Sequence, residues 1–292
     1  MFSDTMISAK GWKKDVSVTT KTLKREEIQA FQKDIYRYYE CHRRDLPWRK
    51  TRDPYHILVS EIMLQQTQVE RVIEKYEKFI TVFPDPSSLA GASLKDVLGV
   101  WQGLGYNRRA RSLMLTAGII VTMYDGKMPV SVGELSGLPG IGKTTAGEIA
   151  AFAFNLPVVF IETNIRRVFI HHFFPEESAV KDREIMPLVE ATLDREHPRD
   201  WYYALMDYGS MLKKVVKNPN RQSAHYKKQS SFANSDRQIR GAILRILLRE
   251  SALTRSELQR KVNVEPDRAE RILAGMTGEG LVREDNGEYR VA

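Results

Sequence analysis

Residues 138–146 read Leu-Pro-Gly-Ile-Gly-Lys-Thr-Thr-Ala, and this stretch organises the rest of the chain. Two glycines one residue apart, next to a proline and before an alanine-rich apolar run, are typical of a tight hairpin that opens a helix. The first backbone N–H groups of a helix lack internal partners and lie at the positive end of the helix dipole. The loop Gly140-Ile-Gly142 is therefore a candidate phosphate site with Lys143 beside it, although such turns are also common as plain corners.

The composition is that of an ordinary soluble protein, and 292 residues are enough for more than one domain. A formal net charge of +8 and a pI near 9.4 suit a polyanionic partner without requiring one. The single cysteine, Cys41, excludes an internal disulfide framework and any all-cysteine metal or iron–sulfur site. No apolar run is long enough for a bilayer and no secretory signal is visible, so we expect a cytoplasmic, nucleoid-associated protein.

Helical periodicity dominates the sequence up to about residue 212, and long strand alternation is scarce, so we expect an almost all-α main body. The sequence divides into four expected parts. They are a flexible basic arm over residues 1–24, a helical domain over 25–212, a basic linker over 213–235 and a small C-terminal domain over 236–292.

Several helix starts are indicated by local signals. Asp53-Pro54 predicts an N-cap with proline at the first helical position. Thr67 with Glu70 forms a capping-box pattern for the next helix. Further along, either Thr163 or Asn164 is expected to cap the helix that follows an apolar segment.

From Asp236 to Ala292 the pattern changes to three helices followed by a hairpin. Asn286-Gly287 is a strong two-residue hairpin signal, and Thr254 with Glu257 forms a capping box. This order resembles a winged-helix domain. Such domains often bind DNA and often only pack against partners, and the 11 basic and 10 acidic residues here favour neither.

Two carboxylates stand in apolar settings. Glu61 follows Ile57 and Leu58 at helical spacing, which places it on the apolar face of its helix, and Glu162 ends the apolar run 158–161. Burial disfavours a charged carboxyl group, so one of the pair can be protonated near neutral pH while the other is ionised. An acid and a carboxylate on opposite sides of a bond suit glycosidic cleavage through an oxocarbenium-like transition state. The plainer interpretation is a salt-bridged inward glutamate.

Basic residues accompany aromatic or amide side chains in two further stretches. Within 101–111 a glycine-flanked loop presents Tyr106, and Arg108 and Arg109 follow it. This is either a turn before a solvated helix or an aromatic wedge beside phosphate-binding charges. Between 213 and 235 a run of cations has no intervening acid, and it is either a solvated linker or a phosphate-binding arm.

Five segments, in matching order and spacing over roughly residues 27–215, resemble the helix-hairpin-helix DNA glycosylases. They are Leu46-Pro-Trp48, Ser60-Glu-Ile-Met-Leu-Gln-Gln-Thr-Gln-Val69, Trp101-Gln-Gly-Leu-Gly-Tyr106, Leu138-Pro-Gly-Ile-Gly142 and Glu162-Thr-Asn164. Within that family they look most like the adenine glycosylases, which remove adenine mispaired with guanine or its oxidised form. The resemblance implies an all-α, two-lobed glycosylase domain, followed here by the winged-helix-like α+β domain.

The resemblance also implies a catalytic set of Glu61, Glu162, Thr144 and Asn164. Glu61 stands where the family's general acid protonates the purine ring nitrogen. Glu162, in one segment with Asn164, stands where a carboxylate stabilises the sugar cation. Thr144 occupies the position of the catalytic lysine of bifunctional relatives, and without an amine no Schiff base forms by that route. Water should therefore be the nucleophile, with little or no strand cleavage.

The same resemblance supplies the wedge and hairpin residues of the expected DNA-binding set, and the basic stretches described above supply the rest. Two glutamines and a tyrosine match the wedge that fills the base stack after extrusion, and the hairpin matches the loop that holds a backbone phosphate. Relatives can hold an alkali cation, sodium or potassium, on hairpin carbonyls such as those of Leu138 and Gly140. The DNA-binding set is Gln65, Gln66, Tyr106, Arg108, Arg109, Leu138, Gly140, Gly142, Lys143, Lys213, Lys214, Arg221 and Lys227.

Three departures from the family pattern are visible. Glu162 is a methylene longer than the family's aspartate, which changes the reach of the carboxylate. The segment from Lys213 to Ser231 lacks the four cysteines that hold an iron–sulfur cluster in relatives. We therefore expect no cofactor and no cluster, and we infer that the basic residues take over the DNA contact. The winged-helix-like tail stands in place of the domain that checks the opposite oxidised guanine.

We expect a monofunctional, monomeric DNA glycosylase of base excision repair that acts on double-stranded DNA with a mispaired or damaged base. It should flip out that base and hydrolyse its N-glycosidic bond, with adenine opposite guanine or oxidised guanine as the favoured substrate. Two alternatives stay open. One is a thymine or uracil glycosylase at G mismatches, and the other is a non-catalytic DNA-binding sensor or regulator that uses the winged helix.

Overall fold

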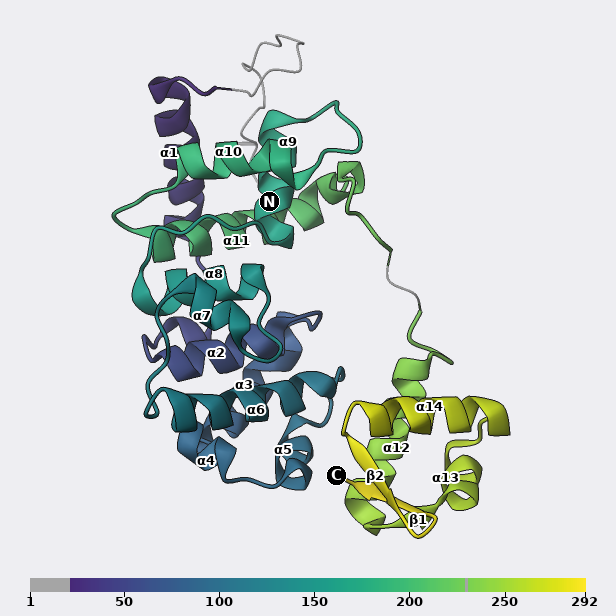
Figure 1. The fold of residues 1–292 in the computed structure, drawn as a ribbon. Helices are drawn as coiled ribbons and strands as arrows, with labels where there is room; N and C mark the ends of the chain where they lie inside the picture. The colour runs from purple at the N-terminus through teal and green to yellow at the C-terminus, as the bar shows by residue number, and fades with distance from the viewer. Residues whose placement is uncertain (1–21, 229–230) are drawn as a thin grey trace. The chain divides into compact units, whose positions relative to one another are not determined.

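The computed structural model describes residues 22–228 and 231–292 and is mostly helical (Figure 1). Contacts divide the chain into two compact units, each built from two separate segments. The first unit holds the described part of residues 1–44 and residues 155–227, and the second holds 45–154 and the described part of 228–292. Within the described ranges, none of the helices has the length and apolar character that a membrane span requires. Most of the predicted basic arm lies outside these ranges.

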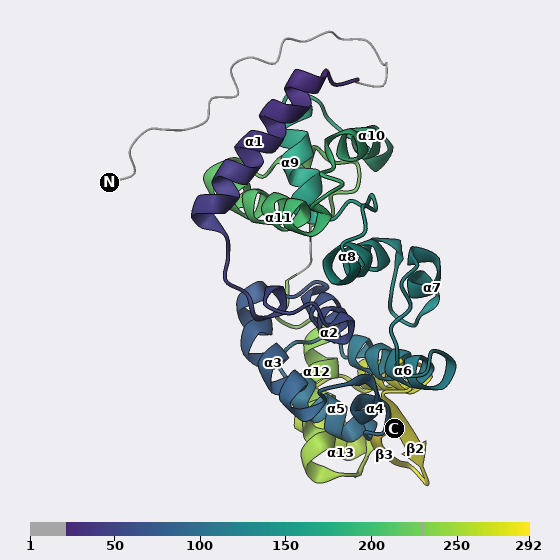
Figure 2. The same cartoon turned by 90° about the vertical axis from the view of Figure 1, so that its left-hand side faces the viewer.

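The described part of the first unit consists of α1 Arg25–His42, α9 Thr163–Phe173, α10 Asp182–Thr192, α11 Pro198–Val215 and the 3₁₀ helix η2 Pro219–Gln222. Phe31 and Ile35 form the buried stripe of α1. The ring of Phe31 packs edge-to-face against Phe169 and Trp201, with centroids 5.4 and 5.8 Å apart. Figure 2 shows α1 running along α9 and α11. An aromatic core thus joins helices that are distant in sequence.

The first segment of the second unit consists of η1 Pro47–Arg49, α2 Pro54–Leu64, α3 Val69–Val82, α4 Pro86–Ala90, α5 Leu94–Trp101, α6 Arg108–Met123, α7 Val132–Gly137 and α8 Lys143–Phe154. Asp53 caps α2, since its carboxylate accepts the N–H groups of Tyr55 and His56 at 2.8 and 3.1 Å. Pro54 is the first helical residue, so the predicted start is confirmed. Most of α2 is buried, and it packs against α8.

The C-terminal segment of the second unit consists of α12 Asp236–Glu250, β1 Leu253–Thr254, α13 Arg255–Val262, α14 Pro266–Gly278, β2 Val282–Asp285 and β3 Glu288–Val291. The three strands form an antiparallel sheet in the order β1-β3-β2. Asn286 and Gly287 both have positive φ, at 51° and 79°, as the predicted hairpin turn requires. The Thr254–Glu257 capping box is confirmed as well. The winged-helix-like order is therefore present, with the short β1 added to it.

Two predicted helix starts are wrong. The helix α3 begins after Gln68 without a side-chain cap, and the hydroxyl of Thr67 instead accepts a hydrogen bond from Arg109 at 2.9 Å. The helix α9 begins at Thr163 itself, and its N-cap is Glu162. At α3 the expected cap is engaged by a residue 42 positions away, whereas at α9 a neighbouring glutamate takes the place of the expected threonine or asparagine.

The two units cut across the parts expected from sequence, because each unit combines two separate segments, and the expected domain boundaries stay a prediction. Lys213 and Lys214 form part of the last turn of α11, and η2 belongs to the first unit. Within the expected linker and C-terminal domain, the residues up to 227 group with the first unit and those from 228 onward group with the second. The helical domain expected over residues 25–212 is thus shared between both units.

Candidate active site and DNA-binding surfaces

Glu61 lies in the middle of α2 with only 7% of its surface exposed. Its neighbours Ile57, Leu58 and Ile62 are buried too. The prediction that Glu61 lies on the inner face of its helix is confirmed. A carboxyl group screened from bulk water in this way suits proton transfer to a bound ligand.

The hairpin of residues 138–142 closes through a hydrogen bond from the N–H of Ile141 to the carbonyl of Leu138, at 3.2 Å. Gly140 has a φ of +79°, and a Cβ atom there would lie 2.8 Å from the Cβ of Ser112. Both facts require glycine at this position. The carbonyl of Gly140 accepts a hydrogen bond from Gln65, and the alkali-cation site at the Leu138 and Gly140 carbonyls stays a prediction.

The start of α8 is open to solvent. Gly142, Lys143 and Thr144 are exposed, and the first intrahelical hydrogen bond runs from the N–H of Ala146 to the carbonyl of Gly142, at 2.9 Å. The N–H groups that precede Ala146 in this turn have no carbonyl partner within the helix. An anion such as a DNA phosphate can bind there, with Lys143 adding charge.

The three predicted wedge residues line one groove of the second unit. The side-chain amide of Gln65 donates to the carbonyl of Gly140 and to the hydroxyl of Thr145, at 3.3 and 3.2 Å. Gln66 and Tyr106 have φ values of +55° and +46°, a conformation that residues with side chains rarely adopt. Such backbone strain concentrates at ligand-binding sites.

Arg109 holds the end of α2. Its Nη1 donates to the carbonyls of Ile62 and Met63, both at 2.8 Å, and its Nη2 donates to the carbonyl of Gly105 at 3.1 Å. Burial lowers the pKa of this guanidinium to about 10, so it remains charged at neutral pH. Its donors face the chain's own carbonyls, and the geometry favours a positioning role over the predicted phosphate contact. Arg108, the first residue of α6, is exposed.

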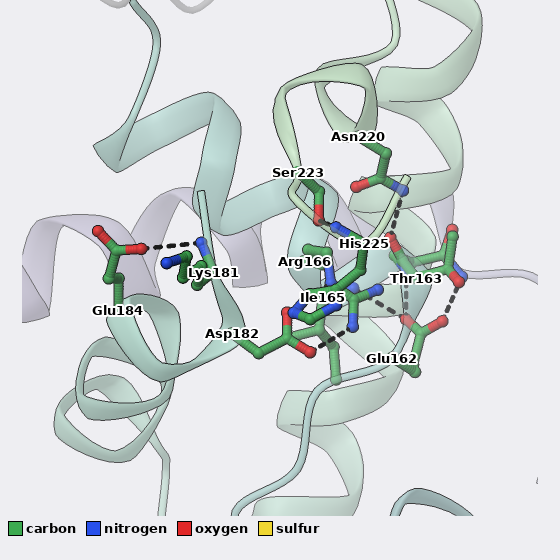
Figure 3. Close-up of polar contacts among 11 residues, drawn as sticks. Glu162, Thr163, Ile165, Arg166, Lys181, Asp182, Glu184, Asn220, Ser223 and His225 are labelled. Atoms are coloured by element: carbon green, nitrogen blue, oxygen red, sulfur yellow. Dashed lines mark hydrogen bonds and ion pairs between the residues drawn. The ribbon is translucent and has the colours of Figure 1, made fainter. Parts of the chain in front are cut away.

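Glu162 lies in the first unit at the N-terminus of α9 (Figure 3). Its Oε1 accepts the N–H groups of Asn164 and Ile165 at 2.6 and 2.8 Å, and its Oε2 accepts the Asn164 amide at 3.2 Å. Burial raises the pKa of the Glu162 carboxyl, while these backbone hydrogen bonds and the charges of Arg167 and Arg166 oppose that rise. The carboxylate therefore has a fixed orientation.

Arg167 supports this arrangement, and the sequence analysis missed it. The residue is 3% exposed, and its Nη1 donates to Asn164 Oδ1 at 2.6 Å and to the carbonyl of Gly209 at 2.7 Å. A Cβ atom at position 209 would lie 2.5 Å from the Asn164 carbonyl oxygen, so α11 and α9 approach closely there. The sequence contained a hint of this burial. Arg167 stands directly before the apolar Val168 of α9, in the way that Glu61 stands directly before Ile62 of α2.

The loop that lacks the family's cysteines is held by amide side chains. Asn218 Oδ1 accepts from Arg167 Nε at 3.1 Å. Asn220 Nδ2 donates to the carbonyl of Thr163 at 2.9 Å, as Figure 3 shows. Gln222 Nε2 donates to the carbonyl of Glu177 at 2.8 Å. Within the described ranges, no group of three or more histidine, cysteine, aspartate or glutamate side chains is placed to hold a metal ion. The predicted DNA-binding cations of this region are exposed, namely Lys213, Lys214, Arg221 and Lys227.

Proteins similar to this chain are DNA glycosylases. A family model described as HhH-GPD superfamily base excision DNA repair protein matches residues 59–191. The chain is 32% identical over 280 residues to the adenine DNA glycosylase of Mycolicibacterium smegmatis, covering 89% of this chain and 95% of that protein. It is 39% identical over 176 residues to the adenine DNA glycosylase of Buchnera aphidicola, covering 60% of this chain but only half of that longer relative. Among solved structures, a thermostable thymine-DNA glycosylase matches with a TM-score of 0.59 and 25% identity, over 66% of this chain and 91% of that one.

Proposed function

Because the chain belongs to the adenine DNA glycosylases of the HhH-GPD superfamily, we propose that it excises adenine mispaired with guanine or oxidised guanine. The observation that carries this proposal is the presence of two differently held acids, Glu61 inside α2 and Glu162 at the start of α9. Both stand in the segments that resemble the family's catalytic ones. DNA is the partner and the N-glycosidic bond is the one broken.

In the proposed reaction Glu61 donates its proton to a ring nitrogen of the flipped adenine, and the C1′–N9 bond breaks with its electron pair going to the base. The deoxyribose is left as an oxocarbenium ion, which the carboxylate of Glu162 stabilises. Water then adds to C1′, and the proton that it loses restores the acid form of Glu61. Since Thr144 carries no amine, no Schiff base forms at that position and strand cleavage is not expected.

The DNA backbone is proposed to bind at the start of α8, where open N–H groups and Lys143 meet a phosphate. We expect a single copy of the chain to act on a duplex with a mispaired base. The loop over residues 216–224 is held by Asn218, Asn220 and Gln222, which supports a glycosylase that works without a cluster. The exposed cations around that loop would add further phosphate contacts.

A panel of duplexes tests this function. Purified full-length protein is incubated with A·G, A·oxidised-G, T·G and U·G duplexes, and alkali then cleaves any abasic site. We expect cleavage of the adenine strand at A·G or A·oxidised-G only, and no cleavage before alkali is added. Cleavage at none of the four pairs would overturn the proposal and leave a DNA-binding protein.

A second candidate is a thymine or uracil glycosylase at G mismatches. The match to a thymine-DNA glycosylase structure favours it, because that structure spans 66% of this chain. The same panel separates the two functions, since this candidate predicts cleavage of the T·G or U·G strand and an intact adenine strand.

A further inference from the structure

The helix α12 of the winged-helix-like segment meets the predicted wedge tyrosine. Arg237, in the first turn of α12, donates from Nη1 to the hydroxyl of Tyr106 at 2.7 Å. Its guanidinium carbon also lies 5.7 Å from the centre of the Tyr106 ring. A Cβ atom at Gly280, which follows α14, would lie 2.8 Å from the guanidinium of Arg111 on α6. Two elements of the C-terminal segment therefore approach the loop and helix that present Tyr106.

Between α12 and the wedge loops lies a groove of about 840 Å³ with a cationic lining. Its arginines are Arg71, Arg108, Arg109, Arg237, Arg240 and Arg245. Glu279 is the acidic residue among the lining residues, and it forms an ion pair with Arg240. Arg245 is exposed and projects from the middle of α12. The charge of the groove is therefore strongly positive.

The remaining lining suits nucleic acid more than an acidic protein segment. Amide side chains of Gln66, Gln68, Gln102 and Asn107 stand beside the arginines and the aromatic ring of Tyr106. Arginines and amides that donate to phosphate, together with a ring for stacking, are what proteins use to hold a DNA strand. Neither the family match nor the predicted DNA-binding set includes α12.

The position of Gln65 indicates which strand the groove would hold. Its amide donates to the carbonyl of Gly140 in the hairpin, and the same residue lines the groove. The proposed function has DNA backbone bound at the start of α8, and we take this to be the strand with the excised nucleotide. A backbone that lies beyond the wedge residue Gln65 then belongs to the other strand. We propose that this groove binds the sugar–phosphate backbone of the strand opposite the excised base, with Arg237 and Arg245 as phosphate contacts. This inference rests on the proposed function.

Binding by full-length variants tests the groove. The ligand is an A·G duplex whose adenosine carries a 2′-fluoro group, which blocks cleavage, and affinity is measured by fluorescence anisotropy over a series of KCl concentrations. We expect Arg245→Ala and Arg237→Ala each to weaken binding about tenfold and to lower the slope of log affinity against log salt by about 0.9 per lost phosphate contact. The control Arg260→Ala removes an exposed arginine on α13 that does not line the groove, and it should change neither quantity.

Neutral methylphosphonate linkages identify the strand. When these linkages are placed in the strand opposite the adenine, Arg245→Ala and the unaltered protein should bind the duplex with equal affinity. When they are placed in the adenine strand, the variant should still bind more weakly than the unaltered protein. If Arg245→Ala and Arg237→Ala show the salt slope of the unaltered protein, the groove assignment is overturned. If Arg245→Ala still binds more weakly when the linkages are in the strand opposite the adenine, the strand assignment is overturned. Tighter binding with faster excision by the variants would overturn the inference in favour of α12 as an inhibitory cover.

The two proposals fail separately. The anisotropy measurement needs no turnover, so normal salt slopes in the groove variants with normal excision on the mismatch panel would overturn the groove alone. If the unaltered protein excises no base on the panel but the groove variants show lowered salt slopes, the catalytic proposal is overturned and the strand-binding groove stands. Thermal melts of each variant confirm that the C-terminal segment remains folded.

Discussion

Glu61 and Glu162 differ in the hydrogen-bond donors that the backbone offers to the carboxyl group. Glu61 lies within α2, where the backbone N–H groups bond along the helix, and the nearby residues Ile57, Leu58 and Ile62 of that helix are buried. Glu162 lies at the start of α9, where two backbone N–H groups of the helix donate hydrogen bonds to its carboxylate. The helix interior offers shielding, and the helix end offers donors and a favourable dipole. The same residue type is thus suited to proton donation in one place and to holding negative charge in the other.

The largest expected effect comes from Glu162→Gln. The amide keeps the volume and part of the capping but removes the charge that is proposed to stabilise the sugar cation. We expect the single-turnover excision rate on an A·G duplex to fall by about 10⁴-fold. Affinity for the uncleavable duplex should stay within a few fold of the unaltered protein. Full activity would contradict the assigned role.

Glu61→Gln should have a smaller effect, about 10²-fold to 10³-fold on the same rate, because solvent can protonate the leaving base in part. A substrate analogue tells the two acids apart. An adenine analogue that leaves readily without protonation should restore much of the rate of Glu61→Gln and little of the rate of Glu162→Gln. Equal rescue of both variants would remove the distinction between them.

Gly209→Ala tests whether the setting of Glu162 depends on α11. The added Cβ would lie 2.5 Å from the Asn164 carbonyl oxygen, so α9 and α11 must separate. We expect the free energy of unfolding in urea to fall by about 1–3 kcal/mol, with a lower excision rate. Gly118→Ala is the matched control, since a Cβ there meets nothing within 4 Å and alanine is the better helix former. Equal stability of the two variants would contradict the close approach.

The smallest expected effect is on the pH dependence of excision. Burial raises the pKa of the Glu162 carboxyl above its ordinary 4.5, and the reaction needs its ionised form. The rate should therefore fall as pH drops through that raised pKa, at a higher pH than an ordinary glutamate would give. Asn164→Ala removes the side-chain donor to Oε2 and should move this acid limb to still higher pH. The pH–rate profiles of the unaltered protein and of Asn164→Ala measure this shift. If the fall in rate at acid pH occurs at the same pH in both, it is due to a group other than Glu162.

Local patterns predicted what local physics decides. The cap at Asp53, the Asn286-Gly287 turn and the burial of Glu61 were each predicted from neighbours within four residues. The cap of α9 was misplaced because threonine and asparagine are the commoner N-caps, whereas here a glutamate reaches the same N–H groups. The two-residue β1 is too short to give a period-2 pattern.

Arg109 shows why the rest of the site could not be predicted. In sequence it follows Arg108 at the start of a helix and looks like a solvated basic residue. Its acceptors are the carbonyls of Ile62 and Met63, 47 and 46 residues earlier, and local spacing contains no information about them. Arg237 and Tyr106 are 131 residues apart and meet for the same reason. Long-range contacts of this kind come only from the fold.

The core of the first unit has a consequence for synthesis. The buried face of α1 is made early, but Phe31 finds its partners on α9 and α11, with Trp201 about 170 residues later in the chain. At roughly 5–20 residues per second, a ribosome needs roughly 10–30 s to synthesise the residues between Phe31 and Trp201. During this interval the apolar stripe of the nascent α1 has no partner, so it is open to chaperones and to mispairing.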